Sequence, residues 1–167
     1  MATPTNLPTA FVAGDILTAA NMNLIRGGFR VLQVVYCFTT KNVTESLVVF
    51  TDTGLTATIT PQFNTSKILA IVSQNGCLKT AGNLNSALNL KLLRGATNIA
   101  NFCAAGGYTA TSIDNIFGGA GVTVLDAPAT TAATIYKTQM QNQQASPTVH
   151  TQFSSAISTI VLMEISA

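Results

Sequence analysis

The feature that most constrains the fold is a series of short segments whose side chains alternate with a period of two. In residues 158–165 (STIVLMEI), every second residue forms one row of side chains. One row is Thr, Val, Met and Ile, and the other is Ser, Ile, Leu and Glu. Successive side chains of a β-strand point to opposite faces, so this pattern predicts strands. Segments of this kind span residues 29–38, 47–50, 55–60, 67–73, 87–93, 97–103, 121–126, 134–141 and 158–165.

Turn-forming residues separate these segments. Asp52-Thr53-Gly54 and Arg94-Gly95 predict turns, Pro61 and Pro128 end strands, and the glycine-rich stretch 106–121 predicts a loop. Eight to ten short strands at regular spacing are the pattern of an antiparallel β-sandwich or jelly roll. The sequence therefore predicts an all-β knob over residues 29–167.

Residues 67–73 (KILAIVS) are apolar in both alternating rows. A strand of this type is either central in its sheet or lies at a subunit interface. If the chain is a trimer, the row Ile68, Ala70 and Val72 is the predicted trimer interface.

Residues 1–28 have a different character. Pro4 and Pro8 predict an extended arm, because proline fixes φ and lacks a backbone donor. Residues 15–26 predict one short helix, with Asp15 or Thr18 as the N-cap and Gly27-Gly28 at the stop. Two or three turns are too few for a stable isolated helix, so we expect it to dock on another surface.

Charge is scarce: 8% of the residues are charged, where a soluble domain has about 25%. This favours a protein that packs against copies of itself or against a larger assembly. The eight basic residues are dispersed rather than clustered, which argues against a nucleic-acid partner. The longest apolar runs, such as residues 68–72, are far shorter than the roughly 18 residues of a membrane span. Residues 1–13 lack a basic region followed by an apolar one, so we expect no Sec signal.

The residues that could carry chemistry are isolated in the sequence. His150 is the single histidine, which excludes a centre with several histidines, and no G-x-S-x-G motif indicates a nucleophile. Asp52 and Asp126 follow strands and are expected to cap turns, and Glu164 is expected to be paired or at an edge. We therefore expect no enzymatic activity, no cofactor and no metal. The acids are Asp15, Glu45, Asp52, Asp114, Asp126 and Glu164.

The other reactive or flexible residues have simple interpretations. The three cysteines are odd in number and form no C-x-x-C pair, so we expect free, half-buried thiols made in a reducing cytosol. The glycines near residue 120 precede a strand and no Lys-Ser or Lys-Thr, so they predict a loop tip rather than a phosphate loop. Without tryptophan, a sugar platform of stacked rings is poorly supported, although Tyr108 could contact a ligand. The cysteines are Cys37, Cys77 and Cys103, and the glycines are Gly118, Gly119 and Gly121.

Two parts of the chain resemble small virion proteins of tailed bacteriophages, including cyanophage and marine phage chains. Residues 11–23 (FVAGDILTAANMN) resemble the N-terminal segment of tail-fibre and other appendage proteins, F-x-x-G-x-x-L-T-A-x-x-x-N. The matching residues are Phe11, Gly14, Leu17, Thr18, Ala19 and Asn23. The second part is a string of β motifs, at residues 31–35, 52–55, 58–61, 66–69, 93–99, 125–128 and 160–165.

The resemblance covers most of the chain and implies a β-sandwich knob that trimerises. Fibre proteins of this kind usually add a long shaft or a larger tip, and this chain has neither. We therefore expect a homotrimeric capsid-decorating (cement) protein that binds the phage major capsid protein. It would lie at the virion surface after assembly in the host cytoplasm. The expected anchors are Leu7, Pro8, Phe11, Val12, Leu17, Met22, Leu24 and Ile25.

Two alternatives remain open at this point. A tail-fibre or baseplate appendage would use its knob loops, such as residues 106–119 and 141–148, to recognise a host surface. A polysaccharide-degrading spike would need a pair of acids facing one groove, and the sequence nominates no such pair.

Overall fold

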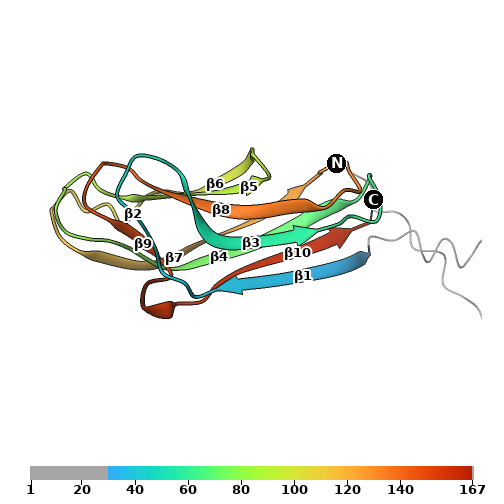
Figure 1. Ribbon diagram of the computed structural model, residues 1–167, viewed down its shortest axis with the longest axis horizontal. Coiled ribbons are helices and arrows are strands. Elements are labelled where there is room, and N and C mark those ends of the chain that lie inside the picture. The colour runs from blue at the N-terminus through green and yellow to red at the C-terminus, as the bar shows by residue number, and fades with distance from the viewer. Residues whose placement is uncertain (1–29, 167) are drawn as a thin grey trace, which may run out of the picture.

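Two antiparallel β-sheets pack face to face in the computed structural model, which describes residues 30–166 (Figure 1). The strands run along the long axis of the molecule. They are β1 (Val31–Thr39), β2 (Val43–Glu45), β3 (Thr51–Ile59), β4 (Lys67–Lys79), β5 (Leu88–Arg94), β6 (Thr97–Gly106), β7 (Asn115–Asp126), β8 (Thr134–Asn142), β9 (Val149–Thr151) and β10 (Ser158–Ile165).

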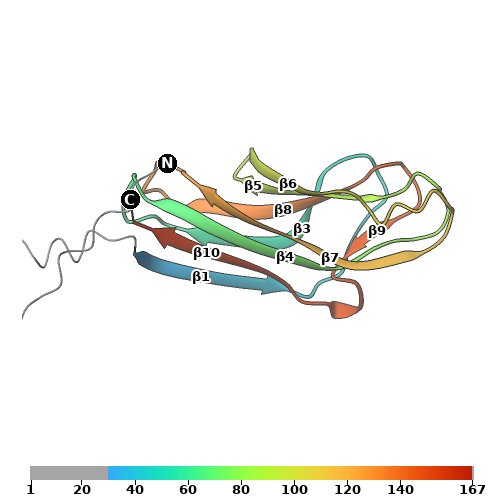
Figure 2. The same cartoon turned by 180° about the vertical axis from the view of Figure 1, so that it is seen from behind.

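The long strand β4 organises the first sheet. Strand β7 pairs along one edge of β4, while β10 and β9 pair with the two ends of its other edge (Figure 2). Strands β1 and β2 continue beyond β10 and β9, so the sheet is β1-β10-β4-β7 at one end and β2-β9-β4-β7 at the other. The second sheet has the order β3-β8-β5-β6. This is the double-sheet arrangement of a jelly roll, as predicted.

The core lies between the sheets in two apolar clusters. The larger cluster includes Leu55, Ile68, Tyr136 and Ile160, all at most 1% exposed. The smaller one, around Met140, lies further along the same strands. Fully burying one such side chain contributes about 1.5–3 kcal/mol, so the alternating inner rows account for most of the stability of the sandwich.

A buried polar layer separates the two clusters. On β8, Thr138 lies between Tyr136 and Met140, and on β4 the matching position is Gln74. The side chains of Thr53, Thr138, Gln74 and Ser158 are linked by hydrogen bonds and are all fully buried. Each polar group therefore has a partner, which is the condition for burying it without a large cost.

The predicted turn at residues 52–54 is wrong, because these residues belong to strand β3. Asp52 pairs with Gln139 and Thr56 with Lys137, so the three residues between the pairs on β3 oppose a single residue on β8. The extra residues form a bulge, in which Gly54 takes a positive φ of 81°. The turn-forming residues thus bend a strand instead of ending it.

The predicted glycine loop is also partly wrong. Gly118, Gly119 and Gly121 lie inside β7, where they pair with β4. A Cβ atom on Gly119 would lie 2.6 Å from the carbonyl oxygen of Gln74, and one on Gly121 would lie 2.9 Å from that of Val72. The glycines therefore permit a close approach of two backbones, which is their second common use in strands.

The remaining predictions have mixed outcomes. Residues 158–165 form β10 as predicted, whereas residues 47–50 form no strand and precede β3 as an exposed segment. Within residues 30–166 the only helical element is a short 3-10 turn, Phe153–Ser155. The arm and the helix predicted at residues 15–26 lie outside the described residues.

Candidate functional site

The outer face of the first sheet is a continuous apolar surface. Cross-strand pairing places Val34 of β1 opposite Met163 of β10, Met163 opposite Leu69 of β4, and Leu69 opposite Leu125 of β7. The adjacent row is formed by Tyr36, Val161, Ile71 and Thr123. We call these residues, with Phe38 at the end of the next row, the apolar face.

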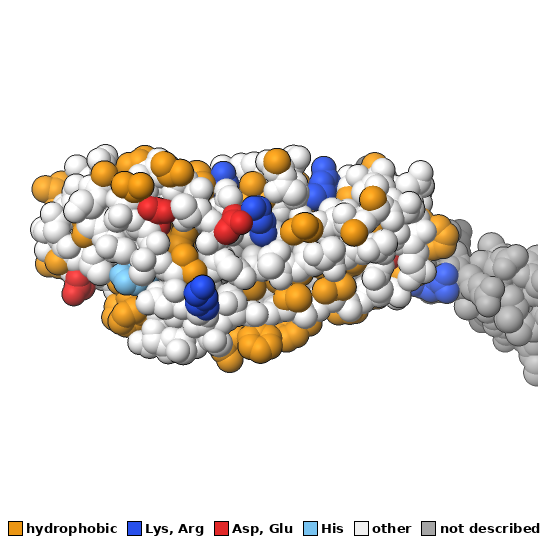
Figure 3. Space-filling model, viewed as in Figure 1, with side chains coloured by type: hydrophobic (Ala, Val, Ile, Leu, Met, Phe, Trp, Pro, Cys, Tyr) orange, Lys and Arg blue, Asp and Glu red, His pale blue; other side chains and the backbone are white. Residues whose placement is uncertain are grey.

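The side chains of the edge strands are the most exposed part of the apolar face. Val34, Tyr36 and Phe38 on β1 are 56%, 58% and 60% exposed, and Leu125 on β7 is 54% exposed. The Tyr36 and Phe38 rings stack with 6.1 Å between their centroids. Figure 3 shows hydrophobic side chains gathered on the side of the molecule where β1 runs. Soluble monomers rarely expose large continuous patches of this kind, so the apolar face is a candidate interaction surface.

The apolar face carries no charge in its rows. Lys67, opposite Ile165, is the nearest charged residue in register and lies at the end of β4. A partner could therefore cover the face without desolvating an ionic group, which is the costly part of burying a surface.

The predicted trimer-interface residues Ile68, Ala70 and Val72 do not lie on this face. They are 0%, 0% and 3% exposed and belong to the core between the sheets. This corrects the prediction, because a second copy cannot contact them without opening the sandwich. The other row of β4, with Leu69 and Ile71, is the one that faces outward. Every predicted anchoring residue, from Leu7 to Ile25, lies outside the described residues.

Asp126 and Asp52 accept hydrogen bonds from side chains rather than capping turns, which corrects that expectation. Both carboxylate oxygens of Asp126 lie 2.7 Å from an Arg94 guanidinium nitrogen, and the Tyr136 hydroxyl donates to one of them at 2.6 Å. Burial, and then the adjacent Asp126 carboxylate, raises the pKa of Tyr136 well above its usual range. These contacts join β5, β7 and β8 as a structural cluster.

Asp52 lies on the outer face of the second sheet. It accepts from Lys137 Nζ at 2.8 Å and from the Gln139 amide at 2.7 Å. Partial burial raises the pKa of Asp52, but these hydrogen bonds outweigh it and the net pKa is lowered. Asp52 is therefore an ionised, paired carboxylate.

Glu164 is fully buried and paired, as expected for a strand residue with apolar neighbours. It accepts hydrogen bonds from the Gln33 amide at 2.5 Å and from the backbone N–H groups of Gln62 and Phe63. Burial raises the pKa of Glu164, but the hydrogen bonds together lower it below its ordinary value. Glu164 thus fastens the loop after β3 to β10.

The described residues bring no reactive constellation together. No group of three His, Cys, Asp or Glu side chains within residues 30–166 is placed to hold a metal ion. Cys37, Cys77 and Cys103 are free thiols. Burial raises the pKa of Cys77 to about 12, which keeps it protonated and unreactive. Burial also lowers the pKa of His150, whose ring packs edge-on against Phe153.

In residues 30–166 no helix is long and apolar enough to cross a membrane.

The sequence pattern that indicates the apolar face lies in β1, whereas the prediction of an interface relied on residues 67–73. In residues 31–38 (VLQVVYCF) both alternating rows are apolar apart from Gln33, as they are in residues 68–72. Two doubly apolar strands in one sheet predict an apolar outer face in addition to the core face.

Comparisons with known proteins add little to this picture. No protein-family model matches the chain, and no curated protein matches it significantly. Among solved structures, a similar chain is found in the crystal structure of the infectious bursal disease virus VP2 subviral particle, with 12% identity, 80% of this chain covered and a TM-score of 0.46. The match covers 33% of that chain. At this identity and score, the likeness assigns neither a family nor an activity.

Proposed function

We propose that this chain is a structural protein of a tailed-bacteriophage virion whose β-sandwich forms homotrimeric knobs that decorate and reinforce the capsid shell. The observation that carries the proposal is the uncharged apolar face on β1, β10, β4 and β7. The phage context rests on the resemblance of residues 11–23 to virion appendage proteins.

The apolar face suits a second copy of the same chain. Its rows hold no charge, so like copies meet without repulsion, and most soluble oligomers are closed and built from identical chains. Tyr36 and Phe38 would be the central anchors, since large aromatic side chains dominate interface energies. In a trimer, three such faces would surround the axis.

The first and last described residues lie together, which favours attachment of the knob to the capsid through one end of the sandwich. Ser166 N–H donates to the carbonyl oxygen of Arg30 at 2.9 Å, and Arg30 N–H donates to the Ser166 hydroxyl at 2.9 Å. Residues 30 and 166 therefore lie side by side at one end of the sandwich. If residues 1–29 hold the capsid anchors, the strands would project lengthwise from the shell.

Two measurements test the proposal. Analytical ultracentrifugation of the purified full-length chain should give three times the chain mass of 17.4 kDa. Added to shells of its phage that lack it, the chain should bind and raise the temperature at which the shells break. A chain that stays monomeric at all concentrations would contradict the trimer, and binding only to isolated tails would contradict the shell location.

The second candidate is a tail-fibre or baseplate appendage that recognises a host surface. Its support is the resemblance of residues 11–23 to fibre proteins. The copy number per virion separates the two candidates: a cement protein is present in many copies, an appendage in a few trimers.

A further inference from the structure

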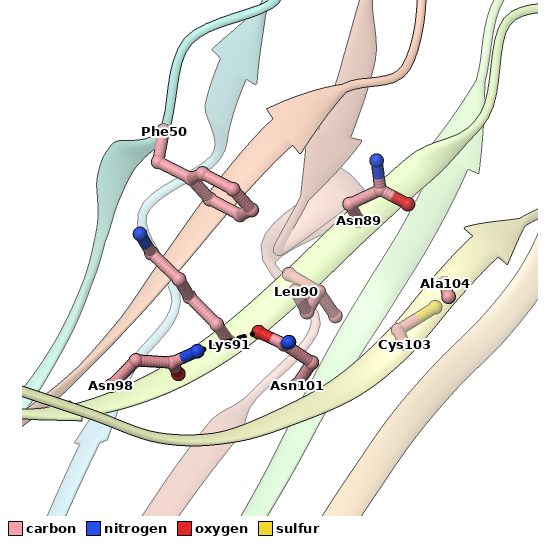
Figure 4. Close-up of a pocket in the computed structure, with 8 residues that line it drawn as sticks. All are labelled: Phe50, Asn89, Leu90, Lys91, Asn98, Asn101, Cys103 and Ala104. Atoms are coloured by element: carbon pink, nitrogen blue, oxygen red, sulfur yellow. Dashed lines mark hydrogen bonds between the residues drawn. The ribbon is translucent and has the colours of Figure 1, made fainter.

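We propose that the outer face of the second sheet carries a binding site for an acidic sugar, a single pyranose ring that bears a carboxylate. The site is a cavity of about 340 Å³ over β5 and β6, closed on one side by Phe50 (Figure 4). It lies on the sheet opposite the apolar face, so it stays open when that face is covered. The inference therefore does not depend on the proposed trimer or on the capsid.

Irregular pairing between β5 and β6 makes the cavity. The register shifts three times along these strands, between Leu88 and Leu90, between Leu90 and Lys91, and between Leu92 and Leu93. As a result Leu90 and Cys103, which pack in the core, also line the cavity. Bulges of this kind are common beside binding sites. A volume near the lower end of the range for small-ligand sites, about 300–1,000 Å³, suits one sugar ring.

Three asparagine amides supply the polar groups of the cavity. Asn98 Nδ2 donates to Asn101 Oδ1 at 3.0 Å, and Asn89 Oδ1 accepts from the Ala105 N–H at 2.9 Å. These bonds leave Asn98 Oδ1 as an acceptor and the Nδ2 groups of Asn89 and Asn101 as donors, with no partner among the described residues. Amides that offer donors and an acceptor side by side match the neighbouring hydroxyls of a sugar.

Lys91 supplies the charge. Its Nζ lies 3.8 Å from the centroid of the Phe50 ring, which holds the ammonium group by a cation–π contact. No acidic side chain lines the cavity, and the nearest carboxylate in register, Asp52, is paired with Lys137 and Gln139. Gln139 lies between Asp52 and Lys91 across the strands. Lys91 is thus a positioned cation without a carboxylate partner among the described residues.

These groups favour a carboxylate-bearing sugar over the other ligands of similar size. A neutral sugar would bring no opposite charge to Lys91, and a bare anion would offer no hydroxyl donor to Asn98 Oδ1. A single ammonium group suits a carboxylate, whereas phosphate sites usually combine several cations or backbone N–H groups. Because one face of the Phe50 ring is occupied by Lys91, the site does not rely on ring stacking.

The test uses the full-length chain labelled with ¹⁵N and four probes: methyl glucuronide, methyl glucoside, acetate and inorganic phosphate. The two glycosides differ only in carrying a carboxylate or a hydroxymethyl group. Methyl glucuronide should shift the signals of Asn89, Asn98 and Asn101 in a saturable way. Methyl glucoside should bind about fivefold more weakly, which corresponds to about 1 kcal/mol, the upper end for one exposed charge pair. Acetate and phosphate should cause no saturable shift.

Two variants and a control locate the site. Lys91→Gln should remove the preference for the glucuronide while leaving glucoside binding in place. Asn101→Ala should weaken both glycosides. Lys67→Gln removes an exposed charge from the other sheet, and it should change neither affinity.

The possible results are distinguishable. Absence of saturable glucuronide binding to the folded chain overturns the proposal. So does an unchanged preference in Lys91→Gln, and so does phosphate binding as tight as glucuronide binding, which would mean a simple anion site. Folding of each variant is checked from the dispersion of the same spectra.

Discussion

The hydroxyl of Thr138 donates a hydrogen bond to Oε1 of Gln74 at 2.9 Å, across the space between the two sheets. Both side chains are fully buried, and the Thr53 hydroxyl completes the chain of hydrogen bonds. This contact joins β8 to β4 in the middle of the sandwich, between the two apolar clusters. It is therefore a buried polar link between the two sheets, of the kind that adds stability when every member is satisfied.

Replacing Thr138 by valine should destabilise the chain by about 1–3 kcal/mol, because the shape is kept but Gln74 and Thr53 each lose a buried partner. Urea unfolding followed by circular dichroism measures the change. Thr58→Val is the matched control on the exposed face of β3 and should change stability little. Equal effects of the two variants would show that the buried layer is not an integral part of the fold.

Stability should fall in acid through Glu164. Its pKa is lowered in the folded chain from an ordinary value of 4.5. A group with a lowered folded pKa contributes stability that is fully present above the unfolded value and is lost as the pH falls through the folded value. The free energy of unfolding should therefore decline below about pH 4.5, by about 1.4 kcal/mol for each unit of the shift. Glu164→Gln should flatten this part of the profile; an unchanged slope would assign it to other carboxylates.

The apolar face should control self-association. Tyr36→Glu places a charge in the centre of that face and should convert the trimer to monomer in ultracentrifugation without unfolding it. Ile135→Glu changes an equally apolar side chain, 48% exposed on the second sheet, and should leave the trimer intact. If Ile135→Glu dissociates the trimer and Tyr36→Glu does not, the interface lies on the second sheet, which would contradict the proposal.

The two rows of β4 should respond differently to truncation. Ile68→Ala removes a fully buried side chain and should cost about 2–5 kcal/mol in the free energy of unfolding. Ile71→Ala, on the outer row, should cost much less in a monomeric background such as Tyr36→Glu. Thermal unfolding of both variants in that background makes the comparison, and a similar loss from each would contradict the assignment of the rows.

The N-terminal arm should carry capsid binding. A chain without residues 1–27 should keep both sheets, since residues 30–166 contain all ten strands and both core clusters. It should no longer sediment with phage shells. In the full-length chain, Phe11→Asp with Leu17→Asp should have the same effect, whereas Thr9→Ser should not. Retained sedimentation of the truncated chain would refute the anchor assignment.

Much of this fold follows from local pattern. Alternation is a property of consecutive residues, so residues 158–165 and the inward row of Tyr136, Thr138 and Met140 could be predicted without knowing any partner strand. The low charge similarly predicted a surface poor in ionic groups, and the rows of the apolar face hold none. Asn89 and Lys91 alternate with buried leucines, which places them outside the core but does not say what they adjoin.

Other features depend on strands that are distant in the sequence. Both rows of β4 are apolar, and only the packing of the second sheet against Ile68 makes that row the core and leaves Leu69 outside. Gly119 suits a turn or a strand equally well, and the proximity of Gln74 selects the strand. The cavity proposed as a sugar site joins Phe50 to β5 and β6 through irregular pairing, which no local pattern encodes. Local sequence specifies which residues alternate; long-range contacts choose which alternating row is buried, because burial is a property of two surfaces rather than of one.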